Sequence, residues 1–273
     1  MNYPVAMIPY TNMAPYRENG VPKECRFVFL NPLKSIQALK ENKVLAAAVP
    51  VGGLPLLQNI IEPLGSFGIA AKERSMSVLF FTDREFSSFI FPAKVRITSH
   101  SASSVRLLYL LFGYNNGFSR MPCRVQAGEP FNGELIIGDA ALQRARHLKM
   151  DLDSGNTQKS EMIIDLATEW YKKHKLPFVF ARWVIRRDAP AKIRRSIENW
   201  LAEFKEYENQ LVEKSALRAA EHLNMTVDYL KTYFNVIRRS LTSEDLAGQE
   251  LFLAEFEKYQ KEPVFNYCRK LGE

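Results

Sequence analysis

The sequence predicts an α/β protein of two lobes, with a hinged cleft between the lobes and a helical C-terminal tail. Short runs of β-branched and aromatic residues alternate with helical patterns over the first two-thirds of the chain, and only helical patterns follow Pro190. The length of 273 residues suits one large domain or two modest ones. The fold class is therefore set by two groups of βα units and the tail that follows them.

The first group of predicted elements lies before residue 88. Its strands are Val5–Pro9, Arg26–Leu30, Leu45–Val49, Ile61–Leu64 and Ser77–Thr82, and its helices are Leu33–Glu41 and Gly53–Asn59. Strands separated by helical segments are typical of βαβ units. We therefore expect a mostly parallel sheet.

The second group repeats this alternation. Its strands are Lys94–Ile97, Cys123–Gln126, Glu134–Ile137, Met162–Ile164 and Phe178–Ile185, and its helices are Ser101–Phe112, Ala140–Leu148 and Asp165–His174. In the first of these helices Val105, Leu108 and Phe112 fall on one face, which indicates packing on a sheet.

The tail is predicted to be helical and to pack back on the first lobe. Its helices are Ala191–Gln210, Lys214–Leu223, Thr226–Ser240 and Ser243–Tyr259. The chain would then cross between lobes near residues 88 and 187, which gives lobe 1 as 1–88 plus 187–273 and lobe 2 as 89–186. Two crossings form a hinge, the architecture of solute-binding proteins that close around a ligand.

Composition narrows the class of ligand. Apolar residues make up 47% and charged residues 25%, as in ordinary soluble proteins, and the net charge of +7 favours an acidic small molecule. Cys25, Cys123 and Cys268 lack metal or redox spacing, and no zinc motif or phosphate-binding loop occurs. We expect no metal and no cofactor.

Without a signal peptide or an apolar run of membrane length, we expect a cytoplasmic protein that binds no membrane.

The first turn of the chain carries Thr11 and Asn12 directly after a predicted strand. Ligands of open α/β sheets bind beyond the carboxyl ends of the strands. Thr and Asn offer hydroxyl and amide groups there, whereas a nucleotide pyrophosphate would need a glycine-rich turn. The turn therefore predicts a site for a polar small molecule.

Three further positions are candidates for ligand contact. The segment from Thr98 to Ser104 ends a strand and opens a helix, and its many hydroxyls favour an anion at the helix start, although helix capping alone needs only one of them. Asp139 suits a helix N-cap and could also face the cleft. Ser77 starts a strand and either points into the cleft or is an ordinary strand serine.

One segment allows a different function. Ala219–Leu230 resembles a helix-turn-helix, and the nearby Lys231, Arg238 and Arg239 would suit DNA phosphates. Paired helices of this kind are common in helical regions, and the first two-thirds of the chain would then have no role beyond ligand sensing. Binding to nucleic acid is therefore the weaker alternative.

Five stretches of the chain carry a resemblance to a known family. They are Tyr10-Thr11-Asn12-Met13-Ala14-Pro15, Ser77-Val78-Leu79-Phe80-Phe81, Ser101-Ala102-Ser103-Ser104-Val105, Ile137-Gly138-Asp139-Ala140-Ala141-Leu142 and Leu176-Pro177-Phe178-Val179-Phe180-Ala181-Arg182-Trp183. Together they resemble the menaquinone-biosynthesis enzymes of the futalosine route, in particular the branch that dehydrates chorismate. The resemblance covers nearly the whole chain, and its most specific part is the segment from Leu176 to Trp183.

The same comparison marks departures from the family pattern. Pro50-Val51-Gly52-Gly53 replaces the usual Pro-Ser after the third strand, Thr11 and Met13 differ in the first turn, and Arg182 stands where an apolar residue is usual. All lie at or near the expected cleft.

The resemblance implies a two-lobed fold like that of type II periplasmic binding proteins. It also implies conversion of chorismate, a dicarboxylate, to 3-enolpyruvylbenzoate and water without a cofactor. On this basis Asn12 and Ser77 are the catalytic candidates. The substrate-binding candidates are Thr11, Gly52, Ser101, Ser103, Ser104 and Asp139. A non-catalytic or divergent carboxylate-binding protein on the same scaffold is the alternative. The oligomeric state is left open.

Overall fold

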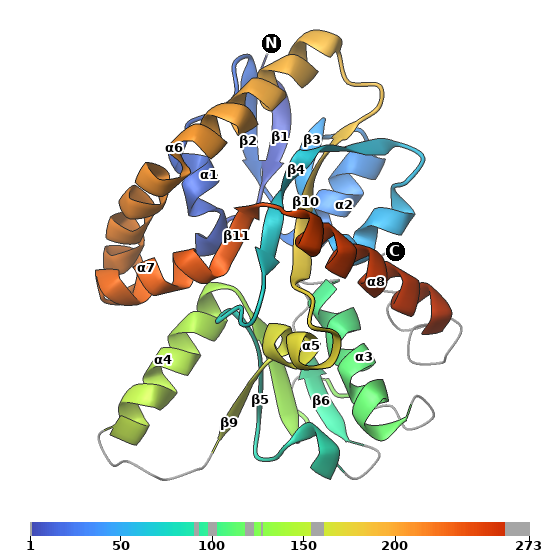
Figure 1. Ribbon diagram of the computed structural model, residues 1–273, viewed down its shortest axis with the longest axis vertical. Helices are drawn as coiled ribbons and strands as arrows, with labels where there is room; N and C mark the ends of the chain where they lie inside the picture. The colour runs from blue at the N-terminus through green and yellow to red at the C-terminus, as the bar shows by residue number, and fades with distance from the viewer. Residues whose placement is uncertain are drawn as a thin grey trace.

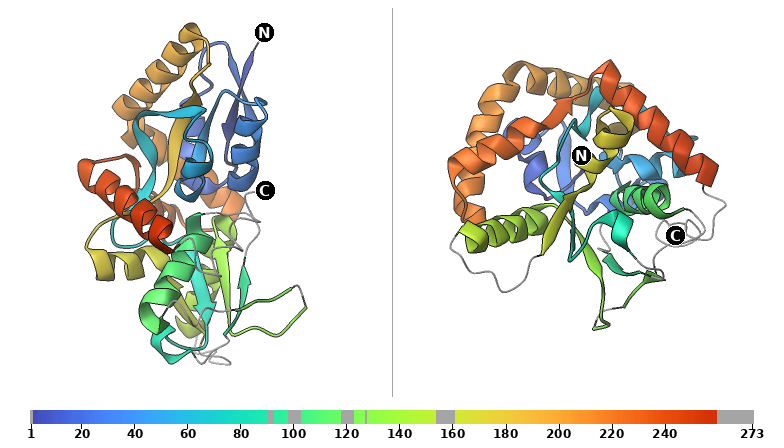
Figure 2. Two further views of the ribbon diagram at one scale, coloured as in Figure 1. Left: turned by 90° about the vertical axis from the view of Figure 1, so that its right-hand side faces the viewer. Right: turned by 60° about the horizontal axis from the view of Figure 1, so that its bottom comes forward.

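The computed structural model describes residues 2–89, 93–97, 103–117, 123–126, 128–153 and 161–259. Within them two sheets form two lobes that are stacked along the long axis of the molecule (Figure 1, Figure 2). The six-stranded sheet of lobe 1 has the order β11-β4-β10-β3-β1-β2, and the five-stranded sheet of lobe 2 has the order β7-β6-β8-β5-β9.

The strands have the following bounds. Lobe 1 contains β1 (Tyr3–Met7), β2 (Cys25–Phe29), β3 (Ala46–Pro50), β4 (Ile61–Ala71), β10 (Phe178–Arg186) and β11 (Ile237–Ser240). Lobe 2 contains β5 (Val78–Thr82), β6 (Lys94–Ile97), β7 (Cys123–Arg124), β8 (Gly133–Ile137) and β9 (Met162–Asp165). Apart from the longer β4, the shorter β7 and the unpredicted β11, these bounds lie within two residues of the predicted ones.

Sheet membership indicates where the chain changes lobe. β4 belongs to the first sheet and β5 to the second, and the return takes place between β9 and β10. Both changes come before the expected positions near residues 88 and 187. We therefore propose 2–71 plus 178–259 as lobe 1 and 78–165 as lobe 2, with the helix between β9 and β10 beside the second crossing.

The sheets are mixed, so the prediction of a mostly parallel sheet was wrong. β1 runs parallel to β2 and β3, but β10 runs antiparallel to both β3 and β4, and β5 runs antiparallel to β8 and β9. The reason is the double crossing: the chain leaves lobe 1 along β4 and returns along β10, so these neighbours point in opposite directions. Alternating elements along the chain do not reveal this.

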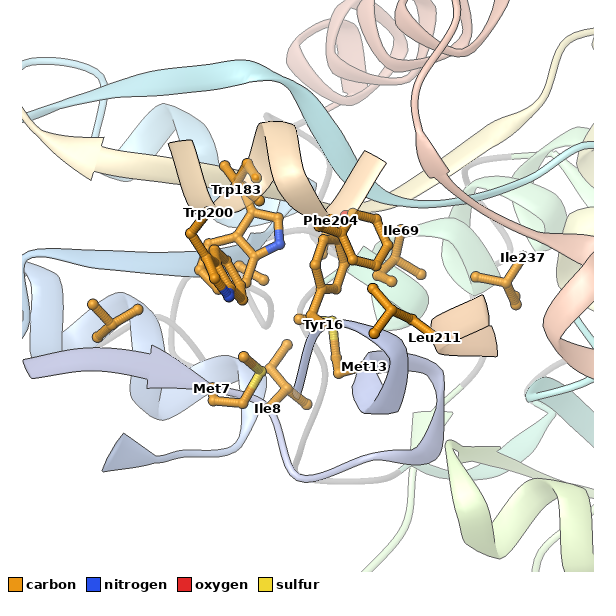
Figure 3. Packing of buried hydrophobic residues seen from close by; sticks show 14 of the residues in the cluster. Met7, Ile8, Met13, Tyr16, Ile69, Trp183, Trp200, Phe204, Leu211 and Ile237 are labelled. Atoms are coloured by element: carbon orange, nitrogen blue, oxygen red, sulfur yellow. The ribbon is translucent and has the colours of Figure 1, made fainter. Parts of the chain in front are cut away.

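Helix α6 (Ala191–Leu223) is continuous, although the sequence suggested a break after Gln210. No glycine or proline interrupts it, and Leu211 and Val212 near the expected break are buried in the core. Figure 3 shows the side chains beneath the helix. Tyr16 stacks on Phe204 of α6 with ring centroids 4.1 Å apart, and Trp183 of β10 packs edge-on against Tyr16.

The other helices of lobe 1 surround its sheet and its edge nearest lobe 2. They are α1 (Ala14–Glu18), α2 (Pro32–Lys40), α7 (Val227–Val236) and the 3-10 turns η1 (Thr11–Met13) and η2 (Val51–Leu56). The predicted helix Thr226–Ser240 ends early, because residues from Ile237 to Ser240 form β11 and pair with β4. β-branched Val236 and Ile237 favour extended backbone, and the free edge of β4 supplies hydrogen-bonding partners.

Lobe 2 contains α3 (Ser103–Asn116), α4 (Asp139–Asp153) and η3 (Phe86–Ser88), and α5 (Leu166–His174) follows β9. The last helix, α8 (Ser243–Tyr259), crosses the middle of the molecule (Figure 1). It packs on β10 and η2 and also contacts α3. The tail thus contacts both lobes and not only the first. None of the helices among the described residues is long and apolar enough to cross a membrane.

Candidate functional site

A cavity of about 60 Å³ lies where the two lobes meet. Its walls come in lobe 1 from the segment after β1, from η1, the start of α2, β3, β4, β10 and β11, and in lobe 2 from the start of β5, the end of β8 and the start of α3. The polar lining residues are Tyr10, Asn12, Ser77, Ser103 and Ser104. The remaining lining residues are Ile8, Pro32, Pro50, Ile69, Val78, Ile137, Gly138, Phe180, Ala181 and Ile237. An apolar cleft with few convergent polar groups is typical of a small-molecule site.

Asn12 and Tyr10 line this cavity, and each carries a buried polar atom without a hydrogen-bond partner among the described residues. These atoms are the amide oxygen of Asn12 and the hydroxyl oxygen of Tyr10. Burial, with a smaller contribution from the charge of Asp139, raises the pKa of Tyr10 to about 12. The Tyr10 phenol is therefore protonated at neutral pH and can donate a hydrogen bond. Buried polar groups without partners are uncommon and suit a ligand that completes them.

The turn before Ser77 is held in place by Asp165, the residue before α5. The Asp165 carboxylate accepts hydrogen bonds from the backbone N–H groups of Ala167 at 2.9 Å, Ser75 at 2.8 Å and Met76 at 2.7 Å, and from the Ser75 hydroxyl at 3.0 Å. Burial raises the pKa of Asp165, and these donors partly offset that effect. The turn that precedes Ser77 is thus fixed by the same carboxylate that caps α5.

Tyr233 of α7 is a second partner of Ser77 that sequence reasoning missed. Its fully buried hydroxyl donates to the Ser77 hydroxyl at 3.1 Å, across the boundary between the lobes. Tyr233 follows Leu230 on one helix face, so its position in the sequence predicts only a core residue. The one sign in the sequence that Tyr233 makes a polar contact was its phenol group, because a buried tyrosine hydroxyl usually forms a hydrogen bond.

Ser103 joins the lobes as well as lining the cavity. Its hydroxyl accepts the N–H of Gly52 at 3.0 Å and donates to the carbonyl oxygen of Phe180 at 3.0 Å. A hydroxyl has a single donor, so Ser103 cannot also donate to an anion while this contact is made. Ser104, next in α3, lines the cavity. Ser101 lies outside the described residues.

Thr11, Gly52 and Asp139 lie behind the cavity wall and are not among its described lining residues. The Asp139 carboxylate, at the start of α4, accepts the backbone N–H of Thr11 at 2.9 Å. A side chain at Gly52 would place its Cβ 2.7 Å from the Arg106 Nη1 atom. These three residues therefore hold the lobes together, and glycine is needed where η2 approaches α3.

The cleft offers neutral donors and acceptors. Its described lining includes no carboxylate, imidazole or ammonium group. Over the residues that the structure describes, no group of three or more His, Cys, Asp or Glu side chains could hold a metal ion. The arrangement can orient a polar ligand and stabilise charge that develops on it. The cavity is smaller than the roughly 300 Å³ at the lower end of ligand sites, so the lobes must part to admit a ring.

Solved structures with this architecture include periplasmic binding proteins. The chain is 8% identical to the alkanesulfonate-binding protein SsuA of Xanthomonas axonopodis, solved with MOPS, with a TM-score of 0.64 and coverage of 98% of this chain and 97% of that one. A Candida albicans protein described as having the generic periplasmic binding protein fold is 12% identical, with a TM-score of 0.59 and coverage of 100% and 95%. The fold is thus that of periplasmic binding proteins.

Sequence comparison is more specific. The chorismate dehydratase of Thermus thermophilus is 31% identical over 141 residues, which are 49% of this chain and 51% of that protein. The match therefore spans about half the length of this relative. Residues 3–258 match the sequence model of a family described as menaquinone biosynthesis. Because this second match covers nearly the whole chain, the protein belongs to the menaquinone biosynthesis family.

Proposed function

We propose that this protein converts chorismate to 3-enolpyruvylbenzoate and water in the futalosine route to menaquinone. Membership of the menaquinone biosynthesis family and the similarity to the chorismate dehydratase of Thermus thermophilus support this proposal. The protein is then a hydro-lyase, and the proposal includes the cytoplasmic location expected from the sequence.

The observation that carries the proposal is the pair of unpaired polar groups in the cleft. The Asn12 amide oxygen can accept a hydrogen bond from a ring hydroxyl, and the Tyr10 phenol can donate one to a carboxylate. Chorismate carries one ring hydroxyl and two carboxylates on a compact ring. Its polar groups therefore complement both side chains, and its ring suits the apolar walls.

The reaction removes the proton at ring carbon C3 and the hydroxyl at C4, which leave together as water while the ring becomes aromatic. Negative charge that develops at C3 spreads into the ring carboxylate. Hydrogen-bond donors at that carboxylate stabilise the charge as it forms. We assign this role to Tyr10, Ser104 and the start of α3, and assign orientation of the leaving hydroxyl to Asn12 and Ser77.

The base in this proposal is the enolpyruvyl carboxylate of the substrate itself, which takes the C3 proton and returns it to the departing C4 hydroxyl so that water leaves. The described lining of the cleft has no carboxylate or imidazole that could take the proton. A group within the substrate needs only to be held in the reactive conformation, which the closed lobes would enforce. Asn12 and Ser77 would then act by positioning, not by proton transfer.

Incubating the protein with chorismate and following ultraviolet absorbance tests the function. A dehydratase produces an aromatic product that accumulates with time, and boiled protein gives none. A non-catalytic binding protein on this scaffold would bind chorismate in calorimetry and leave it unchanged, which would refute the proposal.

The basic residues that suggested DNA binding are engaged within the protein. Lys231 pairs with Glu213, Arg238 pairs with Asp245 at 3.1 Å, and Arg239 is 2% exposed and pairs with Glu208 at 3.3 Å. The turn between α6 and α7 exists, but α7 uses its apolar face in the core. We therefore propose no nucleic-acid function.

A further inference from the structure

A second cavity, of about 280 Å³, lies on lobe 1 beneath α8. It shares no described lining residue with the cleft. Its walls come from η2, β4, β10 and α8, four elements that Figure 1 shows meeting on the α8 side of the molecule. Leu54, Pro55, Val184 and Leu253 make much of the wall apolar, and Gln58 and Gln249 add amide groups.

Arg182 of β10 lines this cavity. Side chains alternate along a strand, so Arg182 and Val184 face the cavity while Trp183 between them packs on the opposite side against Tyr16. Arg182 is only 5% exposed. A guanidinium is thereby fixed in an apolar wall.

The charge of Arg182 is not balanced by a carboxylate in the part of the chain that the structure describes. Its guanidinium donates to the carbonyl oxygen of Gly65 at 2.8 Å and more weakly to the amide oxygen of Gln249 at 3.4 Å. Both acceptors are neutral. Its buried Nε has no hydrogen-bond partner among the described residues. Burial lowers the pKa of Arg182, but an arginine side chain stays protonated in proteins.

The nearby Arg187 differs from Arg182 in both respects. Its side chain is 55% exposed and lies 3.6 Å from Glu62, which also pairs with Arg194. Arg187 at the rim is therefore neutralised and hydrated. Arg182 is left as the charged donor of the cavity wall, and a buried charge without a counter-ion is unfavourable unless a partner neutralises it.

We propose that this cavity is a second ligand site, which binds a small organic monocarboxylate with an apolar body. The carboxylate pairs with the Arg182 guanidinium. The apolar body lies against Leu54, Val184 and Leu253, and the Gln58 amide supplies a further donor. The volume accommodates one small molecule, close to the lower end of usual ligand sites.

Titration calorimetry with benzoate tests the site, with neutral benzamide as the matched control ligand. The variants are Arg182→Met, which keeps length but removes charge, and Leu253→Trp, which fills the cavity and leaves the charge. Asn12→Ala serves as a control for binding in the cleft. Thermal melting with and without benzoate gives a second readout and checks that each variant folds.

The proposal predicts that benzoate binds the unaltered protein and raises its melting temperature, whereas benzamide does neither. Arg182→Met and Leu253→Trp should each weaken benzoate at least about tenfold, while Asn12→Ala should bind as the unaltered protein does. If Arg182→Met does not fold, Leu253→Trp decides. The second site would be overturned if benzoate did not bind the unaltered protein. It would also be overturned if a folded Arg182→Met or Leu253→Trp variant bound benzoate with unchanged affinity, or if Asn12→Ala lost benzoate binding. None of these results bears on chorismate turnover.

Discussion

Asn12 and Ser77 enter the cleft from different lobes, and each depends on groups far away in the sequence. Asn12 was predictable because its turn follows a strand and carries polar side chains without a glycine-rich loop. Ser77 was predictable only as a candidate, because its main partner Tyr233 comes 156 residues later. Thr11, Gly52 and Asp139 were predicted at the ligand, but they fasten the lobes. Residue type suggested polarity at these positions, and only packing determines which atoms remain free.

Removing the Tyr233 hydroxyl should impair turnover without unfolding the protein. Tyr233→Phe deletes the donor to Ser77, a change of about 1 kcal/mol that corresponds to roughly a fivefold loss in kcat/KM for chorismate. Tyr229→Phe on the same helix is the matched control. Equal kcat/KM in Tyr233→Phe and the unaltered protein would show that Ser77 does not need this partner.

Gly52→Ala should weaken substrate binding. The new Cβ would lie 2.7 Å from Arg106 Nη1 and 3.3 Å from the Ser103 Cα, so the Arg106 side chain must shift and η2 and α3 must give way slightly. We expect a severalfold higher KM because the lobes close less well. Asp188→Ala, which changes a side chain that is 60% exposed, is the control. An unchanged KM in steady-state kinetics would contradict this role of Gly52.

Helices and strands with a clear hydrophobic periodicity were predictable from the sequence. Strands that form only by pairing with a strand far away in the sequence were not. Most predicted strands appear within two residues of their expected ends, because turn residues and β-branched runs mark them locally. β11 was missed because its residues continue a helical pattern, whereas its partner β4 lies far earlier in the chain. The antiparallel direction of β10 relative to β3 and β4 likewise depends on the topology of the chain and was not predictable from local sequence.

The junction of β9 and α5 should be the most sensitive element boundary. Asp165→Ala removes the acceptor of three backbone N–H groups and one hydroxyl, and should cost about 3 kcal/mol of unfolding free energy in urea titration. It should also lower kcat by releasing the turn before Ser77. Asp83→Ala, whose side chain is 63% exposed in its ion pair, is the control and should change stability by less than about 0.5 kcal/mol. Equal unfolding free energies for both variants would contradict the capping role.

Across the whole molecule, hydrogen bonds beside the cavity help to hold the lobes in the conformation described. They include Thr11 N–H to Asp139, Tyr233 to Ser77, Gly52 N–H to Ser103 and Ser103 to the carbonyl oxygen of Phe180. Their lengths are ordinary, and they lie around one narrow cavity. The cleft is therefore closed, and opening must break only a few contacts. α8 packs on both lobes and limits how far they part.

Asp139→Ala should shift the lobes toward an open arrangement. The substitution deletes the acceptor of Thr11, so the radius of gyration from small-angle scattering should rise and more chorismate should be needed to reverse it. Asp188→Ala lies outside the cleft, with a side chain 60% exposed, and should scatter as the unaltered protein does. A radius of gyration equal to that of the control would show that this contact does not govern closure.

We propose that the interlobe cleft dehydrates chorismate through Asn12 and Ser77. Proton NMR of chorismate with the unaltered protein, Asn12→Ala and Ser77→Ala tests it most directly. We predict stoichiometric 3-enolpyruvylbenzoate with the unaltered protein and about a 100-fold lower rate with each variant, as for a substrate that is no longer held in the reactive position. Chorismate left intact by the unaltered protein would contradict the function. Full activity in both variants would contradict the site.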